Sequence, residues 1–513
     1  MKIKVVLSLV VFCVALLLVP ITNLVGNMPL AKDALKESRL VEFFFNVDFL
    51  ETSLNRLLFG FGFSSDPEQA IVGKDGWIFL GDKHVNVMSE TRGMSEPDVD
   101  LISGIHLARQ AWHVRIKNQG GLGLYVMIAP NKHSVYSENL PGWAVVAEPR
   151  KMVSAFLEAG RSDSTLIDLR EPMLKAKAEA PYNLYYKTDT HWNRLGAWYG
   201  YKAMSEAIGR SHPWIKWLTD ESVVITGEVE RAGGDLSNFL RLRDYLTDRE
   251  VGIEITQDIK VHRSAFHADG QRSENESVNI DSPQVPVLME SKNALNNMKV
   301  LWLRDSFGDA LSPYMEATFS TLVRQHFGAV LGEPAAFQKL INEFKPDLVI
   351  MTTVERQSFV PFFANMPPLI VRSEDKAFAQ VSHGVADKAV LHQLSSVDGE
   401  LFEVTGGDPF IEIPLSSIVD GQKNTLLGFD FNCEEASSPN HSIQLFWHDR
   451  SKPWFSEEDS VRFDISTGHL TVDLSASASW SKSREVQSIR LDLNSPSCKK
   501  LTFENISLGE VLN

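Results

Sequence analysis

The chain has 513 residues, of which 43% are hydrophobic and 23% are charged. This composition is typical of a globular protein, and the length exceeds what one hydrophobic core usually organises, so we expect two or three folded units. The formal net charge is -16 and the sequence contains no cluster of Lys and Arg, which excludes the basic surface that nucleic-acid binding requires.

An apolar segment lies near the start of the sequence. Lys2 and Lys4 precede an almost unbroken apolar run, and the 22 residues from 5 to 26 approach the ~20 that cross a bilayer. The residues after Pro20 lack the small side chains that a signal-peptide cleavage site needs. Residues 1–26 are therefore predicted to be a retained inner-membrane anchor with the remainder of the chain in the periplasm, and a cleaved signal peptide is the alternative.

Predicted helices and strands alternate through the next part of the chain. Residues 32–58 have helical spacing, and 71–82 predict a hairpin with Asp75-Gly76 at its tip. Further helices are predicted at 97–119 and 150–159, and apolar strands at 121–130, 164–169, 300–303, 321–325 and 347–353. This alternation indicates an α/β sheet that is mostly parallel and covered on both faces.

Two segments depart from this alternation. Residues 215–295 are polar and rich in Asp, Glu, Arg and Ser, and we interpret them as a long insertion carrying loops. At 400–513, short runs of alternating apolar and polar residues are separated by Gly, Ser, Asn and Pro, which is typical of an antiparallel β-sandwich. The boundary is expected between Ser382 and Gly407, so that the first domain occupies 60–390.

The part of the sequence after the apolar segment contains two cysteines, Cys433 and Cys498. In an exported protein such a pair suits one disulfide, and two unrelated buried thiols are the alternative. The C-x-x-C spacing of a structural zinc site is absent from the sequence.

A candidate nucleophile follows the strand predicted at 300–303, in the sequence Arg-Asp-Ser-Phe-Gly-Asp. Active sites of α/β sheets form at the carboxyl ends of strands. Ser306 would therefore lie on the turn there, with its own N–H directed at a developing oxyanion. Gly233 and Gly234 are further candidates for that oxyanion site. The alternative is that Ser306 only caps a helix.

A candidate base lies in YYKTDTHWNRLG, residues 185–196. Alternate residues of an extended segment share a face, so Asp189 could orient His191, which could accept the proton of Ser306. Asn193 fits the N-cap of a following helix. A structural histidine is one alternative, and a metal site on Asp189 and His191 is another, although no second ligand pair follows nearby.

Five segments in order, GKDGWIFL, APNKHSVYSENLP, LYYKTDTHWNRLGAWYGYKAM, GGDL and LWLRDSFGDALSPY, resemble the SGNH hydrolase-like alginate O-acetyltransferase family of the AlgJ and AlgX type. The resemblance covers about residues 65–370. It implies a triad of Asp189, His191 and Ser306. It also implies a circularly permuted SGNH-like fold, because the serine block of ordinary SGNH esterases comes first.

The resemblance further implies an exported protein that moves acetyl groups onto an exopolysaccharide such as alginate, beside a membrane-bound O-acyltransferase that supplies acetyl. Some members carry a carbohydrate-binding module after the catalytic domain, where this chain has its predicted sandwich. Trp447, Trp454 and Trp480 are therefore candidates for stacking on sugar rings, and a place in the sandwich core is the alternative.

A second group of candidates could bind a uronate-like or hydroxylated glycan. These residues stand near strand ends or just after the serine, and ordinary salt bridges would explain the charged ones equally well: Lys132, Tyr314, Arg324 and Arg356.

Together these features predict an extracytoplasmic O-acetyltransferase that works through an acetyl-enzyme without a cofactor or metal. An acetyl esterase uses the same triad with water as acceptor, and a glycan-binding scaffold protein is the other alternative. Residues 215–295 and the sandwich are expected to build a glycan groove around Ser306.

Overall fold

The computed structural model describes most of the chain: residues 6, 10–14, 17, 19–21, 46–145, 151–266, 272–273, 286–372, 378–398, 401–434, 441–493 and 498–511. Most of the predicted anchor and the first part of the predicted 32–58 helix lie outside these residues, and α4 (Asp48–Gly60) is the described remainder of that helix. None of the described helices is both long and apolar enough to span a bilayer.

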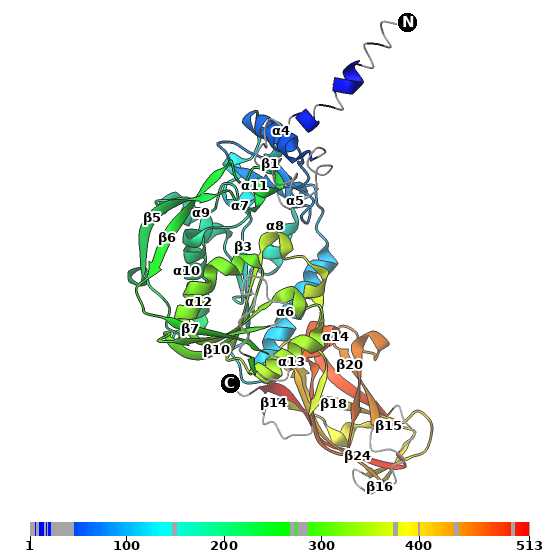
Figure 1. Cartoon of the computed structure of the whole chain (residues 1–513). Helices are drawn as coiled ribbons and strands as arrows, with labels where there is room; N and C mark the ends of the chain where they lie inside the picture. The colour runs from blue at the N-terminus through cyan, green and yellow to red at the C-terminus, as the bar shows by residue number, and fades with distance from the viewer. Residues whose placement is uncertain are drawn as a thin grey trace.

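A mixed sheet organises the first domain (Figure 1). Its described strands run in the order β4 (Leu166–Asp168), β3 (Leu124–Ala129), β12 (Leu348–Val354), β10 (Asn296–Arg304), β11 (Phe319–His326), β9 (Val287–Lys292), β7 (Lys260–Phe266) and β8 (Arg272–Ser273). The strands from β4 to β11 are parallel, and β9, β7 and β8 add an antiparallel edge. The predicted α/β fold is confirmed.

Helices cover both faces of this sheet, because successive side chains of a buried strand point to opposite sides. Along β10, Val300 and Trp302 belong to one core, whereas Leu301 and Leu303 belong to the other. The first core also receives α9 (Arg170–Glu179), α10 (Arg194–Ser211) and α12 (Ser312–Thr318), and the second receives α6 (Val99–Asn118), α8 (Lys151–Ala159) and α13 (Pro334–Phe344).

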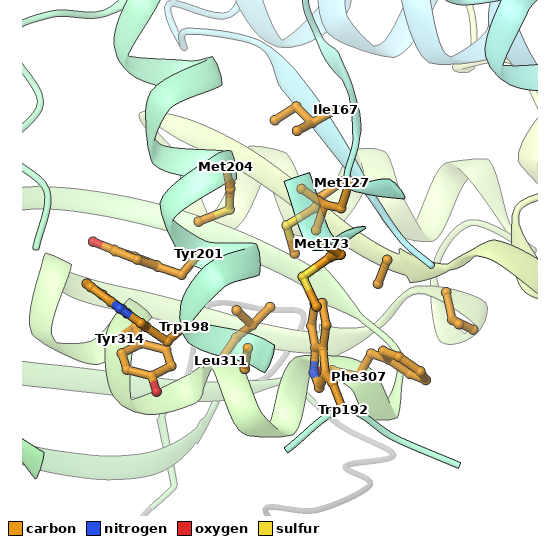
Figure 2. Packing of buried hydrophobic residues seen from close by; sticks show 14 of the residues in the cluster. Met127, Ile167, Met173, Trp192, Trp198, Tyr201, Met204, Phe307, Leu311 and Tyr314 are labelled. Carbon is orange, nitrogen blue, oxygen red and sulfur yellow. The ribbon is translucent and has the colours of Figure 1, made fainter. Parts of the chain in front are cut away.

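The first core surrounds the region where the site forms. Figure 2 shows Met173 of α9 next to Trp192 and Phe307, the residues that follow His191 and Ser306. Trp198, Tyr201 and Tyr314 gather on the other side of Leu311 in the same core. The indole N–H of Trp192 donates to the carbonyl oxygen of Phe307 at 2.9 Å. This contact joins the segment of the candidate base to the segment of the candidate nucleophile from inside the core.

Two hairpins lie outside the main sheet. β1 (Ala70–Val72) pairs with β2 (Ile78–Leu80). Asp75 and Gly76 both have positive φ, 53° and 79°, which is the conformation that the predicted Asp-Gly turn requires. The second hairpin joins β5 (Val223–Ala232) to β6 (Thr247–Ile255).

The interpretation of residues 215–295 as a loop-bearing insertion is wrong. The segment supplies the β5–β6 hairpin, the short helix α11 (Asp235–Phe239) and the antiparallel strands β7 and β9. Most β5 side chains are exposed or half-buried, so this strand needs no apolar face. An apolar pattern therefore could not have revealed it.

A two-sheet sandwich forms the C-terminal region, as predicted, and apolar side chains from both sheets form its core. One sheet contains β13 (Ile370–Arg372), β22 (Gly468–Asp473), β19 (Leu426–Glu434), β24 (Lys500–Val511), β17 (Leu401–Val404), β16 (Leu394–Asp398) and β14 (Phe378–His383). The other contains β15 (Val390–His392), β18 (Phe410–Val419), β23 (Val486–Leu493), β20 (His441–Asp449) and β21 (Ser460–Ile465). Strands β13 and β14 already pair within the sandwich, so it begins earlier than the interval predicted between Ser382 and Gly407.

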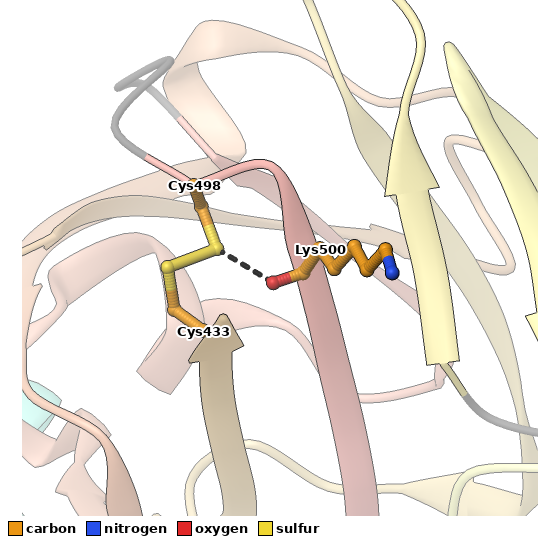
Figure 3. The surroundings of a disulfide bond; sticks show 3 residues. All are labelled: Cys433, Cys498 and Lys500. Atoms are coloured by element: carbon orange, nitrogen blue, oxygen red, sulfur yellow. Dashed lines mark hydrogen bonds between the residues drawn. A yellow bond between two sulfur atoms is a disulfide. The ribbon is translucent and has the colours of Figure 1, made fainter. Parts of the chain in front are cut away.

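The predicted disulfide is confirmed. Cys433 and Cys498 are bonded, with their Cα atoms 5.6 Å apart. Figure 3 shows the bond between the end of β19 and the residues that lead into β24. It therefore ties two neighbouring strands of one sheet together at the same end.

The sandwich is fixed to the end of α6. Arg115, which is fully buried, donates from Nε to Asp473 at 2.8 Å, from Nη1 to Gln338 at 2.7 Å and from Nη2 to the carbonyl oxygen of Pro368 at 2.7 Å. Because α6 runs back to the start of β3, its C-terminal end lies at the amino edge of the parallel strands, and Figure 1 shows the sandwich at that edge. The sandwich therefore does not line the carboxyl edge where Ser306 lies, and its expected part in a groove there is wrong.

Candidate active site

Ser306 lies on a turn that is fixed by its preceding residue. It begins the 3-10 helix η4 (Ser306–Leu311), directly beyond β10. Asp305 accepts the N–H of Phe307 at 2.9 Å with Oδ1 and the N–H of Val354 at 2.7 Å with Oδ2. Since Val354 ends β12, the buried carboxylate ties the turn to the neighbouring strand, while the Ser306 side chain stays exposed.

His191 lies within hydrogen-bond distance of both Asp189 and Ser306. Nδ1 of His191 is 2.8 Å from Oδ1 of Asp189, and Nε2 is 2.8 Å from Oγ of Ser306. With the ring proton on Nδ1, His191 donates to the carboxylate and accepts from the hydroxyl. The imidazole also packs on Phe307, with ring centroids 5.2 Å apart. The structure therefore brings together the three residues that the sequence singled out.

The pKa shifts of the pair follow from its contact and burial. Burial by itself would raise the pKa of Asp189, but the hydrogen bonds and charge of His191 outweigh it and hold that pKa at about 2. Burial would likewise lower the pKa of His191, but the hydrogen bond and charge of Asp189 raise it above 6.5. Asp189 is therefore ionised at neutral pH, and His191 is a stronger base than a free imidazole.

Two residues that the sequence did not single out extend this network. Oδ2 of Asp235 lies 3.9 Å from Nδ1 of His191, and Asp235 also accepts from the N–H and hydroxyl of Thr190 at 2.7 and 2.6 Å. Nη2 of Arg231 lies 3.8 Å from Oδ2 of Asp189. The GGDL block was the only signal for Asp235, because chain distance hides its contact with the D-x-H segment.

The carboxylates and the imidazole have the ligand types of a metal site. Ligand atoms of Asp189, His191 and Asp235 all lie within 4.8 Å of one another. Nδ1 of His191 is engaged by Asp189, and both oxygens of Asp235 accept from Thr190. These contacts make the cluster a hydrogen-bonded network around the imidazole rather than an open ligand set.

Arg356 lies beside the nucleophile turn and contacts Asn131. Asn131 follows β3, and its Oδ1 accepts from Nη1 of Arg356 at 2.9 Å. That contact leaves the Nδ2 of Asn131 as a donor. The guanidinium of Arg356 also lies 5.6 Å from the ring centre of Phe307, the residue after Ser306. Among the predicted glycan-binding residues, Arg356 contacts the turn of Ser306. Asn131 was missed although it stands two residues after the buried strand β3.

The other three predicted glycan-binding residues are buried, so their assignment is wrong. Lys132, Tyr314 and Arg324 are only 2%, 1% and 2% exposed. Lys132 donates to main-chain oxygens, the Tyr314 hydroxyl donates to the carbonyl oxygen of Arg194 at 2.9 Å, and Nη1 of Arg324 donates to Ser312 at 3.2 Å. A polar side chain near the end of a strand can point into the core or into the site, and the sequence alone does not distinguish these two directions.

The assignment of Gly233 and Gly234 to an oxyanion site is also wrong. The N–H of Gly233 donates to the carbonyl oxygen of Leu246 at 2.8 Å, and that of Gly234 donates to Oγ1 of Thr188 at 3.0 Å. Gly234 has a different role. A Cβ at this position would lie 2.3 Å from the Cβ of Asp189, so only glycine allows the two segments to approach so closely.

Two of the three tryptophans proposed for sugar stacking lie in the sandwich core. Trp447 and Trp480 are fully buried and pack edge to face, with centroids 5.2 Å apart. Their indole N–H groups donate to Ser483 and to the carbonyl oxygen of Asn424, each at 3.0 Å. Stacking by these two is therefore wrong, whereas Trp454 is 58% exposed and stays a prediction.

The comparisons with known proteins agree with this architecture. Residues 70–271 match the family model described as "SGNH hydrolase-like domain, acetyltransferase AlgX". The matched span contains Asp189, His191 and Asp235 and ends before Ser306. The SGNH-like fold that the resemblance implied is confirmed.

The first domain is also similar to curated proteins and to solved structures. The chain is 26% identical over 181 residues to the probable alginate O-acetylase AlgJ of Pseudomonas putida, a match that spans 35% of this chain and 44% of that protein. The structure of Bacillus cereus PatB1 with a sulfonyl adduct is 17% identical, with a TM-score of 0.42 over 57% of this chain and 97% of that one. The structure of Pseudomonas aeruginosa AlgX is 13% identical, with a TM-score of 0.35 over 87% of this chain and 96% of that one.

Proposed function

We propose that the chain is a polysaccharide O-acetyltransferase that works through a Ser306-His191-Asp189 triad. The observation that carries the proposal is the pair of 2.8 Å contacts that His191 makes, one with Ser306 and one with Asp189. A hydroxyl, a base and a carboxylate in this order are the groups that an activated serine nucleophile needs. The match of residues 70–271 to a family model described as an acetyltransferase supports acetyl as the transferred group.

The first half of the proposed reaction loads the serine. Oγ of Ser306 attacks the acetyl carbonyl of the donor ester, and its proton passes to Nε2 of His191. The bond to the donor's leaving oxygen then breaks, and that oxygen takes the proton from His191. The N–H of Ser306 and the Nδ2 of Asn131 are our candidates to stabilise the oxyanion.

The second half transfers acetyl to the glycan. A sugar hydroxyl attacks the acetyl carbon while His191 accepts its proton, and the bond to Oγ breaks so that Ser306 recovers its proton. Arg356 is our candidate to contact the acceptor, because its guanidinium lies at the Ser306 turn and burial lowers its pKa without removing its charge.

The proposed location is the periplasm, with residues 1–26 as an inner-membrane anchor and a membrane-bound O-acyltransferase as the source of acetyl. The disulfide between Cys433 and Cys498 supports an oxidising compartment. The apolar sequence of residues 5–26 supports export. An alginate-like polysaccharide is the proposed acceptor, and glycan binding by the sandwich is a separate proposal that rests on the exposed Trp454.

An acetyl esterase is the second candidate. Ser306 is exposed, so water can reach an acetyl-enzyme as readily as a sugar does unless the bound glycan covers it.

The test uses the full-length chain in detergent with an activated acetyl ester and acidic or neutral oligosaccharides. Mass spectrometry should detect acetylated sugar with the wild type, and Ser306→Ala should abolish both transfer and ester cleavage. Ser53→Ala, which changes an exposed serine on α4, should leave both intact. Free acetate as the sole product would favour the esterase, and full activity in Ser306→Ala would refute both.

A further inference from the structure

Lys132 makes an unusual set of contacts for a buried cation. Its ammonium donates to the carbonyl oxygens of Tyr186 at 3.2 Å, Lys187 at 3.1 Å and Asp189 at 2.7 Å. An ammonium has three N–H donors, so all of them are engaged by a single short segment. That segment carries the carboxylate that holds His191.

Carboxylates accept from the N–H groups of the same segment. Asp248 accepts the N–H and hydroxyl of Thr188, each at 2.7 Å, and the N–H of Lys187 at 3.2 Å. Asp235 accepts the N–H of Thr190 at 2.7 Å. Carbonyl groups of the segment thus meet a cation, and its N–H groups meet anions. Main-chain N–H groups also support the segment, since Ile78 donates to the carbonyl oxygen of Lys187 at 2.9 Å and Ser237 donates to that of Thr188 at 3.1 Å. The carbonyl of Asp189 has its described hydrogen bond from Lys132, so the ammonium matters most at that residue.

We propose that Lys132 is a positioning residue for the reaction: its ammonium holds the main chain of residues 186–189 so that the Asp189 carboxylate meets His191 in line with Ser306. This inference rests on the proposed function. The shortest of its three hydrogen bonds is to the carbonyl of Asp189 itself. A shift of the main chain at that residue moves the carboxylate and then the imidazole, whereas Lys132 touches neither Ser306 nor a reacting atom.

The surroundings of Lys132 set the pH range in which it can act. Asp189, Asp235 and Asp248 face the ammonium and favour its charge, and the rings of Trp77 and Phe79 lie 5.7 and 5.4 Å away. Burial outweighs the carboxylates and lowers the pKa of Lys132 to about 8.

A neutral amine has only two N–H donors. Deprotonation therefore removes one of the three hydrogen bonds that Lys132 donates, and its hold on the segment loosens. The expected consequence is an alkaline limb in kcat near the pKa of Lys132, at a pH where the fold persists.

The test compares Lys132→Met with wild type in the full-length chain, and Lys187→Met is the matched control. Lys187 stands on the same segment, but its ammonium donates to the carbonyl oxygen of Asp75 at 3.1 Å and not to the segment itself. Lys132→Met should lower kcat for ester cleavage by about 100-fold, the cost of a misplacement of roughly 1 Å, with KM little changed. It should also lack the alkaline limb and weaken the low-field proton signal of the bond between His191 and Asp189. Lys187→Met should stay within about 3-fold of wild type in kcat.

A Lys132→Met protein that folds, keeps the low-field signal and has the kcat of wild type would overturn the inference. If that variant does not fold, the wild-type profile decides, because a kcat that stays level well above the pKa of Lys132 would overturn it as well. A wild type without esterase activity would count against the proposed function alone, and the proton signal would still test the role of Lys132.

Discussion

Gly234→Ala should disable the site while the fold survives, because the added methyl group collides with Asp189. The new Cβ would lie 2.3 Å from the Cβ of Asp189 and 2.4 Å from its Oδ2, so the carboxylate has to retreat by roughly 1 Å to restore van der Waals contact. A displacement of that size at a catalytic group costs about 100-fold in rate. Overpacking should also lower the free energy of unfolding by about 1–3 kcal/mol.

Initial rates of ester cleavage and urea unfolding of the same samples test this prediction. Gly142→Ala is the control, because a Cβ at Gly142 has no neighbour within 4 Å, and it should keep wild-type rate and stability. Gly234→Ala with a rate within about 3-fold of wild type would refute the reasoning, since it would mean that Asp189 tolerates the displacement or that its exact position does not matter.

Two further predictions concern the domain interface and pH. Asp473→Ala removes the carboxylate that pairs with the buried guanidinium of Arg115 and should lower the free energy of unfolding in urea by about 3–5 kcal/mol. Because the pKa of His191 is raised above 6.5 by Asp189, the neutral base is lost as pH falls through that raised value. The acid limb of kcat/KM for ester cleavage should therefore lie above 6.5, as measured from about pH 5 to about pH 9.

Each of these has its own control. Glu96→Ala is the control for Asp473→Ala. It breaks an ion pair in which the Glu96 side chain is 78% exposed and the Lys151 side chain is 44% exposed, so it should lower the free energy of unfolding by at most about 1 kcal/mol. An equally small loss in Asp473→Ala would contradict the buried-pair argument. Asp189→Asn removes the charge that raises the pKa of His191, so its residual activity should have an acid limb at lower pH, and an unshifted limb would show that the limb belongs to another group.

The elements of the first domain were predictable where they bury apolar side chains. The strands at β3, β10, β11 and β12 are short apolar runs, and burial on both faces of a parallel sheet demands such runs. The β5–β6 hairpin and the strands β7 and β9 were misread as loops, because an exposed ribbon and an antiparallel edge leave no continuous apolar signal.

Local spacing, residue type and motifs were enough to predict the fold class, the disulfide partners and the three residues Asp189, His191 and Ser306. The surroundings of these residues became visible in the folded chain alone. The sequence position of Lys132 suggests a glycan-binding residue. Its contacts show instead a buried ammonium that donates to the carbonyl oxygen of Asp189. Asp235 reaches His191 only through the fold. Hydrogen bonds and burial join residues that are distant in the chain, and the direction in which a polar side chain points depends on packing that no local pattern encodes.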